Sequence, residues 1–162
     1  MQYRSPPTQR RSTMRKIQMV DLQGQYQQIA PQVNAQIQQV LENSAYIGGE
    51  MVQQFSAELA DFLGNSVQVI PCANGTDALQ LAMMALWESH NLQPGDEVLL
   101  PAFTYVATAE VLALLGLKPR WVEVLPDTFV MDPQAAEAAL TPRTKLIMPV
   151  HLYGQAAPMQ EL

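Results

Sequence analysis

The segment Asn74-Gly75-Thr76-Asp77 has the residue types of a phosphate-binding turn and lies between a short apolar run and a long one. We expect a strand, a tight turn and a helix, with Asn74 as the N-cap. Gly75 lets the backbone approach a ligand, and Thr76 adds a hydroxyl donor. The first N–H groups of a helix lack internal partners, which makes the turn a candidate anion site. Asp77 opposes an anion unless its side chain caps the backbone, and many such turns only cap a helix.

Two further groups of residues follow predicted strands. An aromatic side chain in Phe103-Thr104-Tyr105 could stack on a planar ligand, or it could be a core aromatic in a loop. His151 could act in acid–base chemistry, hydrogen-bond a ligand, or serve only as a structural histidine. Tyr153, Gly154 and Gln155 form a predicted turn beside it.

Several common kinds of site have no counterpart in the sequence. It contains no carboxylate pair, no His-rich metal cluster and no Ser-His-Asp set, and we predict no metal site. The Walker A and Gly-x-Gly-x-x-Gly patterns are absent, which weighs against nucleoside-triphosphate or dinucleotide binding. The single cysteine, Cys72, excludes an internal disulfide framework and fits a reducing cytoplasm.

The elements that must position these residues alternate between strand and helix after Gly64. We predict strands over residues 67–70, 97–100, 119–124 and 145–150, and helices over residues 76–90, 105–115 and 133–140. This alternation predicts an α/β fold with a mostly parallel sheet covered by helices on both faces. In such sheets ligands gather at the carboxyl ends of the strands, where all three candidate groups fall.

The chain before the sheet divides into two predicted parts. Residues 1–16 are polar and rich in Arg, Ser and Pro, so we expect a disordered extension, with Met14 as an alternative initiator. Residues 17–64 form a helical segment. Its first helix begins at Pro31, which suits a first helical position, and its second ends at Gly64. Residues 65–162 form the α/β part.

The overall composition bounds the function. The chain has 162 residues, 48% hydrophobic and 15% charged, which is typical of a globular domain. A net charge of −6 argues against a nucleic-acid partner, and no apolar run is long enough to span a membrane.

The segment of residues 78–87 is apolar nearly all round, which predicts burial on more than one side, either at a subunit interface or inside a larger monomer.

The assembled motifs resemble the DegT/DnrJ/EryC1/StrS family of sugar aminotransferases, which are pyridoxal-phosphate enzymes of fold type I. The resemblance covers the chain from about Ile17 onward, and it is nearest to the enzymes that act on UDP-linked 2-acetamido-3-oxo-glucuronate. The matching stretches are Val20-Asp21-Leu22, Ala45-Tyr46-Ile47-Gly48-Gly49, Pro71-Cys72-Ala73-Asn74-Gly75-Thr76-Asp77-Ala78-Leu79-Gln80, Pro94-Gly95-Asp96-Glu97-Val98, Pro101-Ala102-Phe103-Thr104-Tyr105-Val106-Ala107-Thr108-Ala109-Glu110 and Pro149-Val150-His151-Leu152-Tyr153-Gly154-Gln155.

The resemblance implies roles for these residues. Asn74, Gly75 and Thr76 would hold the phosphate of pyridoxal 5'-phosphate, and Tyr105 would stack on its ring. His151, Tyr153 and Gln155 would line the site floor. The implied reaction moves an amino group, usually from glutamate, to a keto group of a nucleotide-linked sugar in surface polysaccharide or amino-sugar synthesis. The implied assembly is a homodimer with shared active sites.

One departure limits what the chain can do alone. The family's Schiff-base lysine lies beyond Leu162, and Lys16, Lys118 and Lys145 do not stand in its motif. We therefore expect the N-terminal part of a large domain, with no catalytic residue of its own and no transamination by this chain alone. Two alternatives stay open: a dehydratase of the same family, in which histidine replaces that lysine, and a non-catalytic fragment or interaction module.

Overall fold

The structure is a computed structural model that describes residues 19–162. The predicted extension of residues 1–16, including Met14, and Lys16 within it lie outside the described residues. By its internal contacts the chain divides into two units between Val69 and Ile70. Each unit is described by itself.

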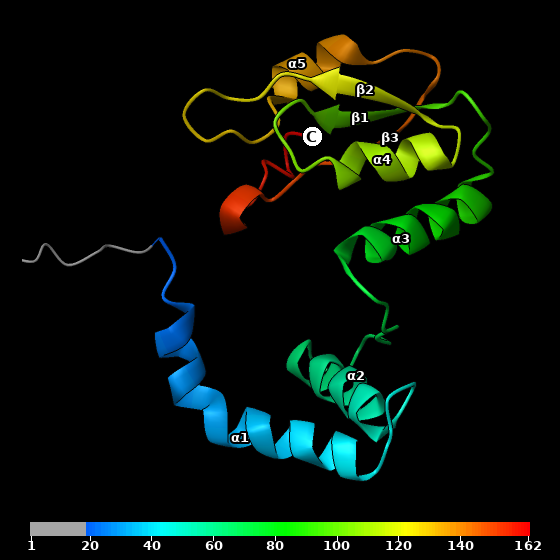
Figure 1. The fold of residues 1–162 in the computed structure, drawn as a ribbon. Helices are drawn as coiled ribbons and strands as arrows, with labels where there is room; N and C mark the ends of the chain where they lie inside the picture. The colour runs from blue at the N-terminus through cyan, green and yellow to red at the C-terminus, as the bar shows by residue number, and fades with distance from the viewer. Residues whose placement is uncertain (1–18) are drawn as a thin grey trace, which may run out of the picture. The chain divides into compact units, whose positions relative to one another are not determined.

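The first unit contains the helices α1 (Leu22–Glu42) and α2 (Glu50–Phe62). The prediction that the first helix begins at Pro31 is wrong. Asp21 caps α1 by accepting a hydrogen bond from the Gly24 N–H at 2.9 Å, so the helix starts well before Pro31. Pro31 therefore lies inside the helix, where proline removes one backbone hydrogen bond. Figure 1 shows α1 bent within its length, as an internal proline would cause.

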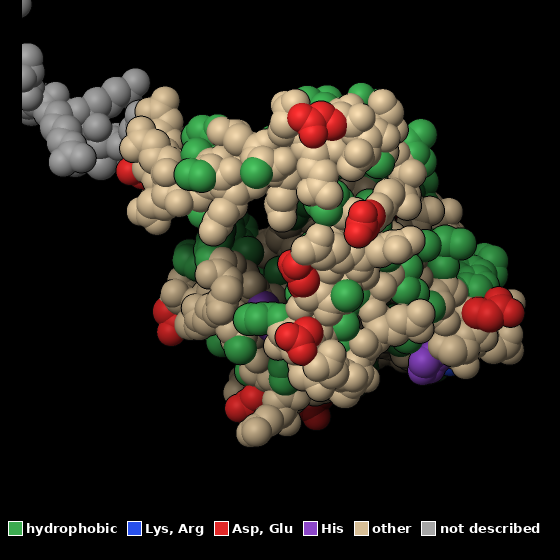
Figure 2. Space-filling view, turned by 90° about the horizontal axis from the view of Figure 1, so that it is seen from below, with side chains coloured by type: hydrophobic (Ala, Val, Ile, Leu, Met, Phe, Trp, Pro, Cys, Tyr) green, Lys and Arg blue, Asp and Glu red, His purple; other side chains and the backbone are tan. Residues whose placement is uncertain are grey.

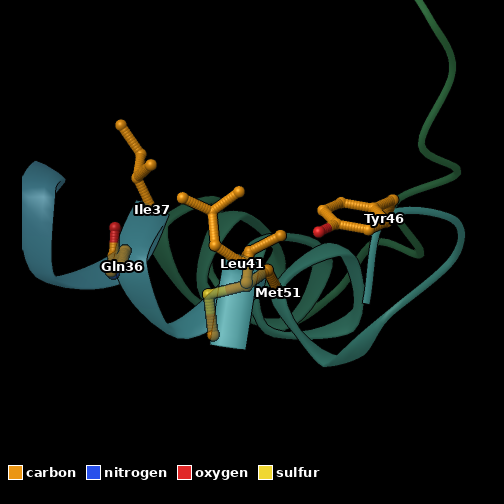
Figure 3. A pocket seen from close by; sticks show the side chains of 6 residues that line it. Gln36, Ile37, Leu41, Tyr46 and Met51 are labelled. Carbon is orange, nitrogen blue, oxygen red and sulfur yellow. The ribbon is translucent and has the colours of Figure 1, made fainter. Parts of the chain in front are cut away.

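The second helix ends as predicted. Leu63 is the C-cap of α2, and Gly64 follows with φ +94°, a conformation that glycine adopts without steric cost. Among the described residues of the first unit, neither α1 nor α2 contains a buried residue. Between them is a hollow of about 330 Å³ (Figure 3), lined by Gln36, Ile37, Val40, Leu41, Tyr46 and Met51. The hollow is apolar and holds no acid, base or cation.

The second unit is built on a parallel three-stranded sheet, and this confirms the predicted α/β class. The strands β1 (Glu97–Pro101), β2 (Lys118–Val122) and β3 (Thr144–Ile147) lie in the order β2-β1-β3. Both pairings are parallel, with Leu99 opposite Arg120 on one side and Ile147 on the other. The remaining elements are α3 (Gly75–His90), α4 (Ala107–Leu114), α5 (Pro133–Ala139) and a 3₁₀ turn, η1 (Leu152–Gly154).

The side chains of β1 alternate between two cores, because successive residues of a strand point to opposite faces. Val98 and Leu100 are fully buried in a cluster with residues of α3 and α4. Leu99 is fully buried in a second cluster with Val122, Met131 and Ala136 of α5. Helices thus cover both faces of the sheet, as the sequence predicted.

Several predicted strand and helix bounds are wrong, including the end of the 119–124 strand, because β2 ends at Val122. Residues 67–70 form no strand, because no described strand pairs with them and a strand requires a hydrogen-bonded neighbour. Strand β3 ends at Ile147 rather than residue 150, since its ladder with β1 ends with the pair Leu99–Ile147. Helix α4 begins at Ala107 rather than Tyr105, because the residues before it form the loop that leaves β1.

Helix α3 is buried on one side only within the described chain. Met83 is its buried residue and packs in the cluster shared with α4. Leu81 and Met84 are 47% and 48% exposed. Burial of the other side, by a partner subunit or by the rest of a larger monomer, stays a prediction. None of the described helices is both long and apolar enough to cross a membrane.

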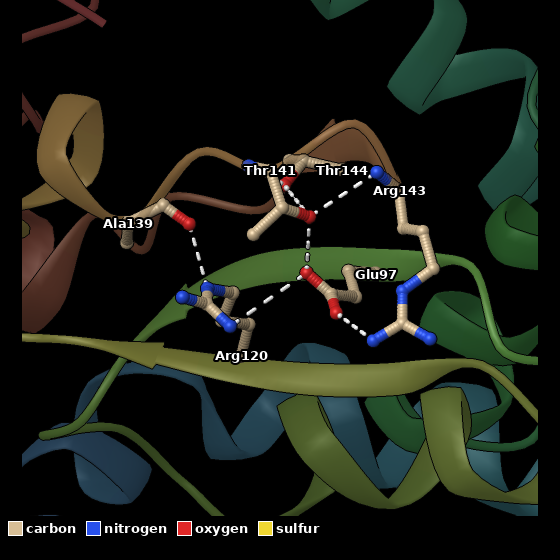
Figure 4. A network of polar contacts seen from close by, with 6 residues as sticks. All are labelled: Glu97, Arg120, Ala139, Thr141, Arg143 and Thr144. Carbon is tan, nitrogen blue, oxygen red and sulfur yellow. Dashed lines mark hydrogen bonds and ion pairs between the residues drawn. The ribbon is translucent and has the colours of Figure 1, made fainter.

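A polar network fixes the amino-terminal edge of the sheet (Figure 4). The buried Glu97 carboxylate accepts hydrogen bonds from the Thr141 hydroxyl at 2.7 Å and from Arg143 Nη2 at 2.9 Å. Arg120 Nη1 lies 3.8 Å from the same carboxylate, and its Nε donates to the Ala139 carbonyl at 2.6 Å. The Thr141 hydrogen bond and the Arg143 charge lower the pKa of Glu97, although burial alone would raise it.

Candidate functional site

The N-terminus of α3 is organised by a reciprocal pair of hydrogen bonds. Asn74 has an extended backbone, and its Oδ1 accepts from the Asp77 N–H at 3.0 Å. Its Nδ2 donates to Asp77 Oδ2 at 3.2 Å. The carboxylate of Asp77 thus bonds to the Asn74 side-chain amide, and no described backbone N–H donates to it, so the condition that the sequence set for an anion site here is not met by a backbone cap. Asn74 is the N-cap that the sequence predicted.

Gly75 and Thr76 leave their backbone N–H groups available. Within residues 19–162 neither N–H has a hydrogen-bond acceptor, whereas the next two N–H groups of the helix bond to Asn74. A Cβ added at Gly75 would meet no atom within 4 Å, so the space beside it is open. Free N–H groups at the positive end of a 16-residue helix favour an anion.

The net field of the chain does not help to bind an anion. The formal net charge is −6, and on the face shown in Figure 2 acidic side chains are spread over the surface while Lys and Arg are scarce. An anion at α3 would therefore depend on local donors, namely the N–H groups of Gly75 and Thr76 and the Thr76 hydroxyl.

Tyr105 lies on the loop between β1 and α4, and the residue is 76% exposed. Its carbonyl accepts from the Thr108 N–H at 3.1 Å. The neighbouring Phe103 packs against Phe129, with ring centroids 5.4 Å apart and planes at 41°. Of the two aromatic residues in this loop, Phe103 is engaged with the protein and Tyr105 is the one free to contact a ligand.

His151 follows β3 and is held in one tautomer. Its Nδ1 accepts a hydrogen bond from the Ala157 N–H at 3.0 Å, so the proton of the neutral ring is on Nε2. His151 and Gln155 are exposed, and Tyr153 is 91% exposed. Tyr153 has φ +53°, an uncommon conformation for a residue with a side chain, and Gly154 follows at φ +83°. The turn predicted here is present.

The topology brings the three groups to one edge of the second unit. Strands β1 and β3 are parallel neighbours, so the loops that carry Tyr105 and His151 leave the same edge. Helices α3 and α4 contact each other, and in Figure 1 their N-termini lie at the end to which the strand arrows point. No hydrogen bond joins the three groups directly within the described chain.

The loop after β2 belongs to the same edge, and sequence reasoning missed it. This loop carries Phe129, and an antiparallel bridge between Val124 and Met131 closes it. The available signal was positional: the end of the 119–124 strand deserved the same inspection as the other strand ends.

Three further features bear on the site: a second hollow, the positions of two lysines, and the metal-binding capacity of the described residues. A hollow of about 380 Å³ beside the start of α3 is lined by Pro71, Cys72, Ala73, Asp77, Gln80, Leu81 and Met84. Lys118 and Lys145 lie in the first two residues of β2 and β3, at the edge opposite the candidate site. In the part of the chain that the structure describes, no cluster of His, Cys, Asp or Glu could hold a metal ion.

Comparison with known proteins now adds to this geometry. The model of the DegT/DnrJ/EryC1/StrS aminotransferase family matches residues 27–162. The chain belongs to this family. The matched segment includes all seven candidate site residues, and the resemblance predicted from the sequence motifs is confirmed.

The relatives place the chain more closely. It is 52% identical over 141 residues to the UDP-2-acetamido-2-deoxy-3-oxo-D-glucuronate aminotransferase of Pseudomonas aeruginosa, covering 87% of this chain and 38% of that protein. A crystal structure of a family aminotransferase from Brucella abortus superposes with a TM-score of 0.80 at 40% identity, over 90% of this chain and 40% of that one. The E. coli GDP-4-keto-6-deoxy-D-mannose-3-dehydratase with bound hydrated PLP matches with a TM-score of 0.70 at 30% identity, over 77% and 32% of the two chains.

The chain spans between about a third and two fifths of the length of these relatives. Its fold is that of the corresponding part of solved family members. The dehydratase shares the fold at lower identity than the Brucella aminotransferase does.

Proposed function

We propose that this chain forms the cofactor-holding part of a pyridoxal 5'-phosphate-dependent sugar aminotransferase. The whole enzyme would transfer an amino group from glutamate to a keto group of a nucleotide-linked sugar. The observation that carries the proposal is the N-terminus of α3, where the N–H groups of Gly75 and Thr76 have no acceptor within the described residues and the space beside Gly75 is open. In a member of this family, that geometry has an evident ligand in the cofactor phosphate.

The residues present fit such a group. The free N–H groups of Gly75 and Thr76 would donate to phosphate oxygens, and the Thr76 hydroxyl offers a third donor. Asn74 would hold the turn and keep the Asp77 carboxylate engaged through its amide. The exposed ring of Tyr105 would stack on the pyridine ring. When bound, the cofactor supplies the electron sink for moving the amino group.

His151, Tyr153 and Gln155 would contact the substrate or line the site floor. The Nδ1 atom of His151 is occupied by the Ala157 N–H, so Nε2–H is the group that it offers as a donor. Tyr153 and Gln155 are exposed on the turn that follows. These contributions bind and orient, and none supplies the lysine that the reaction requires.

The proposal also covers the substrate class, the oligomeric state and the cellular location. The relative at 52% identity acts, by its name, on UDP-2-acetamido-2-deoxy-3-oxo-D-glucuronate, and we propose this class of substrate for a role in surface polysaccharide synthesis. A homodimer would cover the exposed apolar side of α3, where Leu81 and Met84 lie. A cytoplasmic location would suit a nucleotide-linked substrate and the lone, unpaired Cys72.

A chimera tests the proposal. Residues 27–162 would replace the matching segment of the Pseudomonas enzyme, and amino transfer from glutamate to its keto-sugar would be measured. We expect transfer by the chimera and none by the 162-residue chain alone, because Lys118 and Lys145 lie at the wrong edge of the sheet. A chimera that folds and dimerises but does not bind the cofactor would refute the proposed phosphate site at the N-terminus of α3, called the phosphate cup below.

The dehydratase alternative needs a different observation, because the chimera borrows its lysine. Reading the gene past the Leu162 codon decides between the two activities. A lysine in the family's motif supports the aminotransferase, and a histidine in its place supports the dehydratase. A chain that stays monomeric, folded and unable to bind the cofactor would instead favour an interaction module.

A further inference from the structure

The loop that carries Tyr105 is held from both sides by residues outside the loop. The hydroxyls of Thr104 and Thr108 are 3.0 Å apart, and the Thr108 N–H also bonds to the Tyr105 carbonyl. Thr108 is only 6% exposed, so its hydroxyl has little access to water. On the other side, the Phe103 ring packs against Phe129. Residues 103, 104 and 105 are thus each contacted by Thr108 or Phe129.

Phe129 adopts a strained backbone to make its contact. Its φ is +58°, which is a genuine outlier for a bulky side chain. Such conformations persist where the surroundings fix them, and they cluster at functional sites. Here the Phe129 N–H donates to the Leu125 carbonyl at 2.8 Å, and the Leu125 N–H donates to the Val130 carbonyl at 2.9 Å. A short hairpin therefore holds the Phe129 ring against the Tyr105 loop.

We propose that Thr108 and Phe129 are positioning residues that fix the backbone of the loop of residues 102–106, so that the Tyr105 ring is presented for stacking. This inference rests on the proposed function, because it gives the Tyr105 ring a cofactor to stack on. The contacts leave the ring itself exposed and fix only the backbone and its neighbours. A stacking partner acts best when its orientation is set before the ligand binds, since less entropy is then lost on binding.

The first measurement follows the loop of the 162-residue chain without any ligand. Hydrogen exchange of the amides of residues 103–108 would be compared in wild type, Thr108→Val, Thr108→Ser and Phe129→Leu. Valine keeps the shape and removes the hydroxyl, so exchange should rise roughly two- to tenfold, and serine should restore it. Thr141→Val is the matched control, because it removes a hydroxyl from the Glu97 network at the opposite edge and should leave this loop unchanged.

The second measurement is the affinity for pyridoxamine 5'-phosphate, which lacks an aldehyde and cannot react with surface lysines. Tyr105→Leu should weaken binding roughly two- to tenfold. Thr108→Val and Phe129→Leu should weaken it by no more than that. Because both residues act through Tyr105, neither should have any effect in the Tyr105→Leu background.

The outcomes distinguish the positioning role of Thr108 and Phe129 from the stacking role of Tyr105. Unchanged loop exchange in Thr108→Val and Phe129→Leu overturns the positioning role. The positioning role is also overturned if Thr108→Val and Phe129→Leu weaken binding equally in the wild-type and Tyr105→Leu backgrounds. Thr108 and Phe129 would then affect binding without acting through Tyr105. If Tyr105→Leu leaves the affinity unchanged, the proposed stacking role fails, and the positioning role loses its purpose even where exchange shows a loosened loop.

Discussion

Replacing Gly75 by alanine should affect protein stability and ligand affinity in opposite directions. Gly75 is the first residue of α3, and its backbone lies outside the left-handed region that favours glycine. A methyl group there would meet no protein atom within 4 Å. Nothing in the described structure therefore requires glycine at this position, whereas close approach of a phosphate to the helix N-terminus would require it.

The stability effect of Gly75→Ala follows from the unfolded state. A compatible Gly→Ala substitution stabilises by about 0.4–1 kcal/mol, because the unfolded chain loses conformational freedom. For a protein of this size that corresponds to a rise in Tm of about 1–4 °C. Thermal and urea unfolding measure both quantities.

The binding effect should have the opposite sign. A methyl group in the space proposed for the phosphate would force the ligand to shift, at a cost of roughly 1–3 kcal/mol if the site behaves like an overpacked core. The affinity for pyridoxamine 5'-phosphate should then fall roughly five- to hundredfold. Gly116→Ala is the control: its φ of +73° should make the protein less stable, with binding unchanged. Wild-type affinity in a stable Gly75→Ala protein would refute the phosphate cup.

Three further predictions concern the scaffold. Asn74→Ala removes the N-cap acceptor of α3 and should cost about 1 kcal/mol in urea unfolding, while Asn74→Ser should recover most of it. Leu112→Ala empties a fully buried position of the α3–α4 core and should cost about 2–5 kcal/mol, well above the cost at half-exposed Leu81. Because the pKa of Glu97 is lowered in the folded state, its contribution to stability should be complete above its ordinary value of 4.5 and be lost as the pH falls through the lowered value. The urea midpoint between pH 3 and 6 should show this loss, and Glu97→Gln should flatten it; an identical pH profile in the two proteins would contradict the assignment.

The parts of the fold that sequence predicted are those fixed by local patterns. The N-cap at Asn74 and the end of α2 before Gly64 both depend on a few adjacent residues. The parallel sheet was predictable because strand and helix signals alternate. The roles of the candidate site residues stay predictions, since no ligand contact tests them.

The failures have non-local causes. Residues 67–70 have the composition of a strand, but no described strand lies beside them to complete the ladder. Pro31 looked like a helix start, yet the Asp21 cap set the start instead, and a helix can tolerate an internal proline. The Phe103–Phe129 contact joins two loops that are distant in the sequence, and no periodicity in either segment announces it.

The two edges of the sheet differ in how their polar groups are satisfied, and this difference argues for where the chemistry lies. At the amino edge, Glu97 is satisfied by Thr141 and Arg143, so the network stabilises the sheet and leaves little for a ligand to bind. At the carboxyl edge, the Gly75 and Thr76 N–H groups have no acceptor within the described residues, and the Tyr105 ring is largely exposed. Stability alone would not favour leaving these groups open. A ligand with phosphate oxygens and a planar ring would satisfy both, so a change at either the α3 N-terminus or the Tyr105 ring should weaken binding of that ligand.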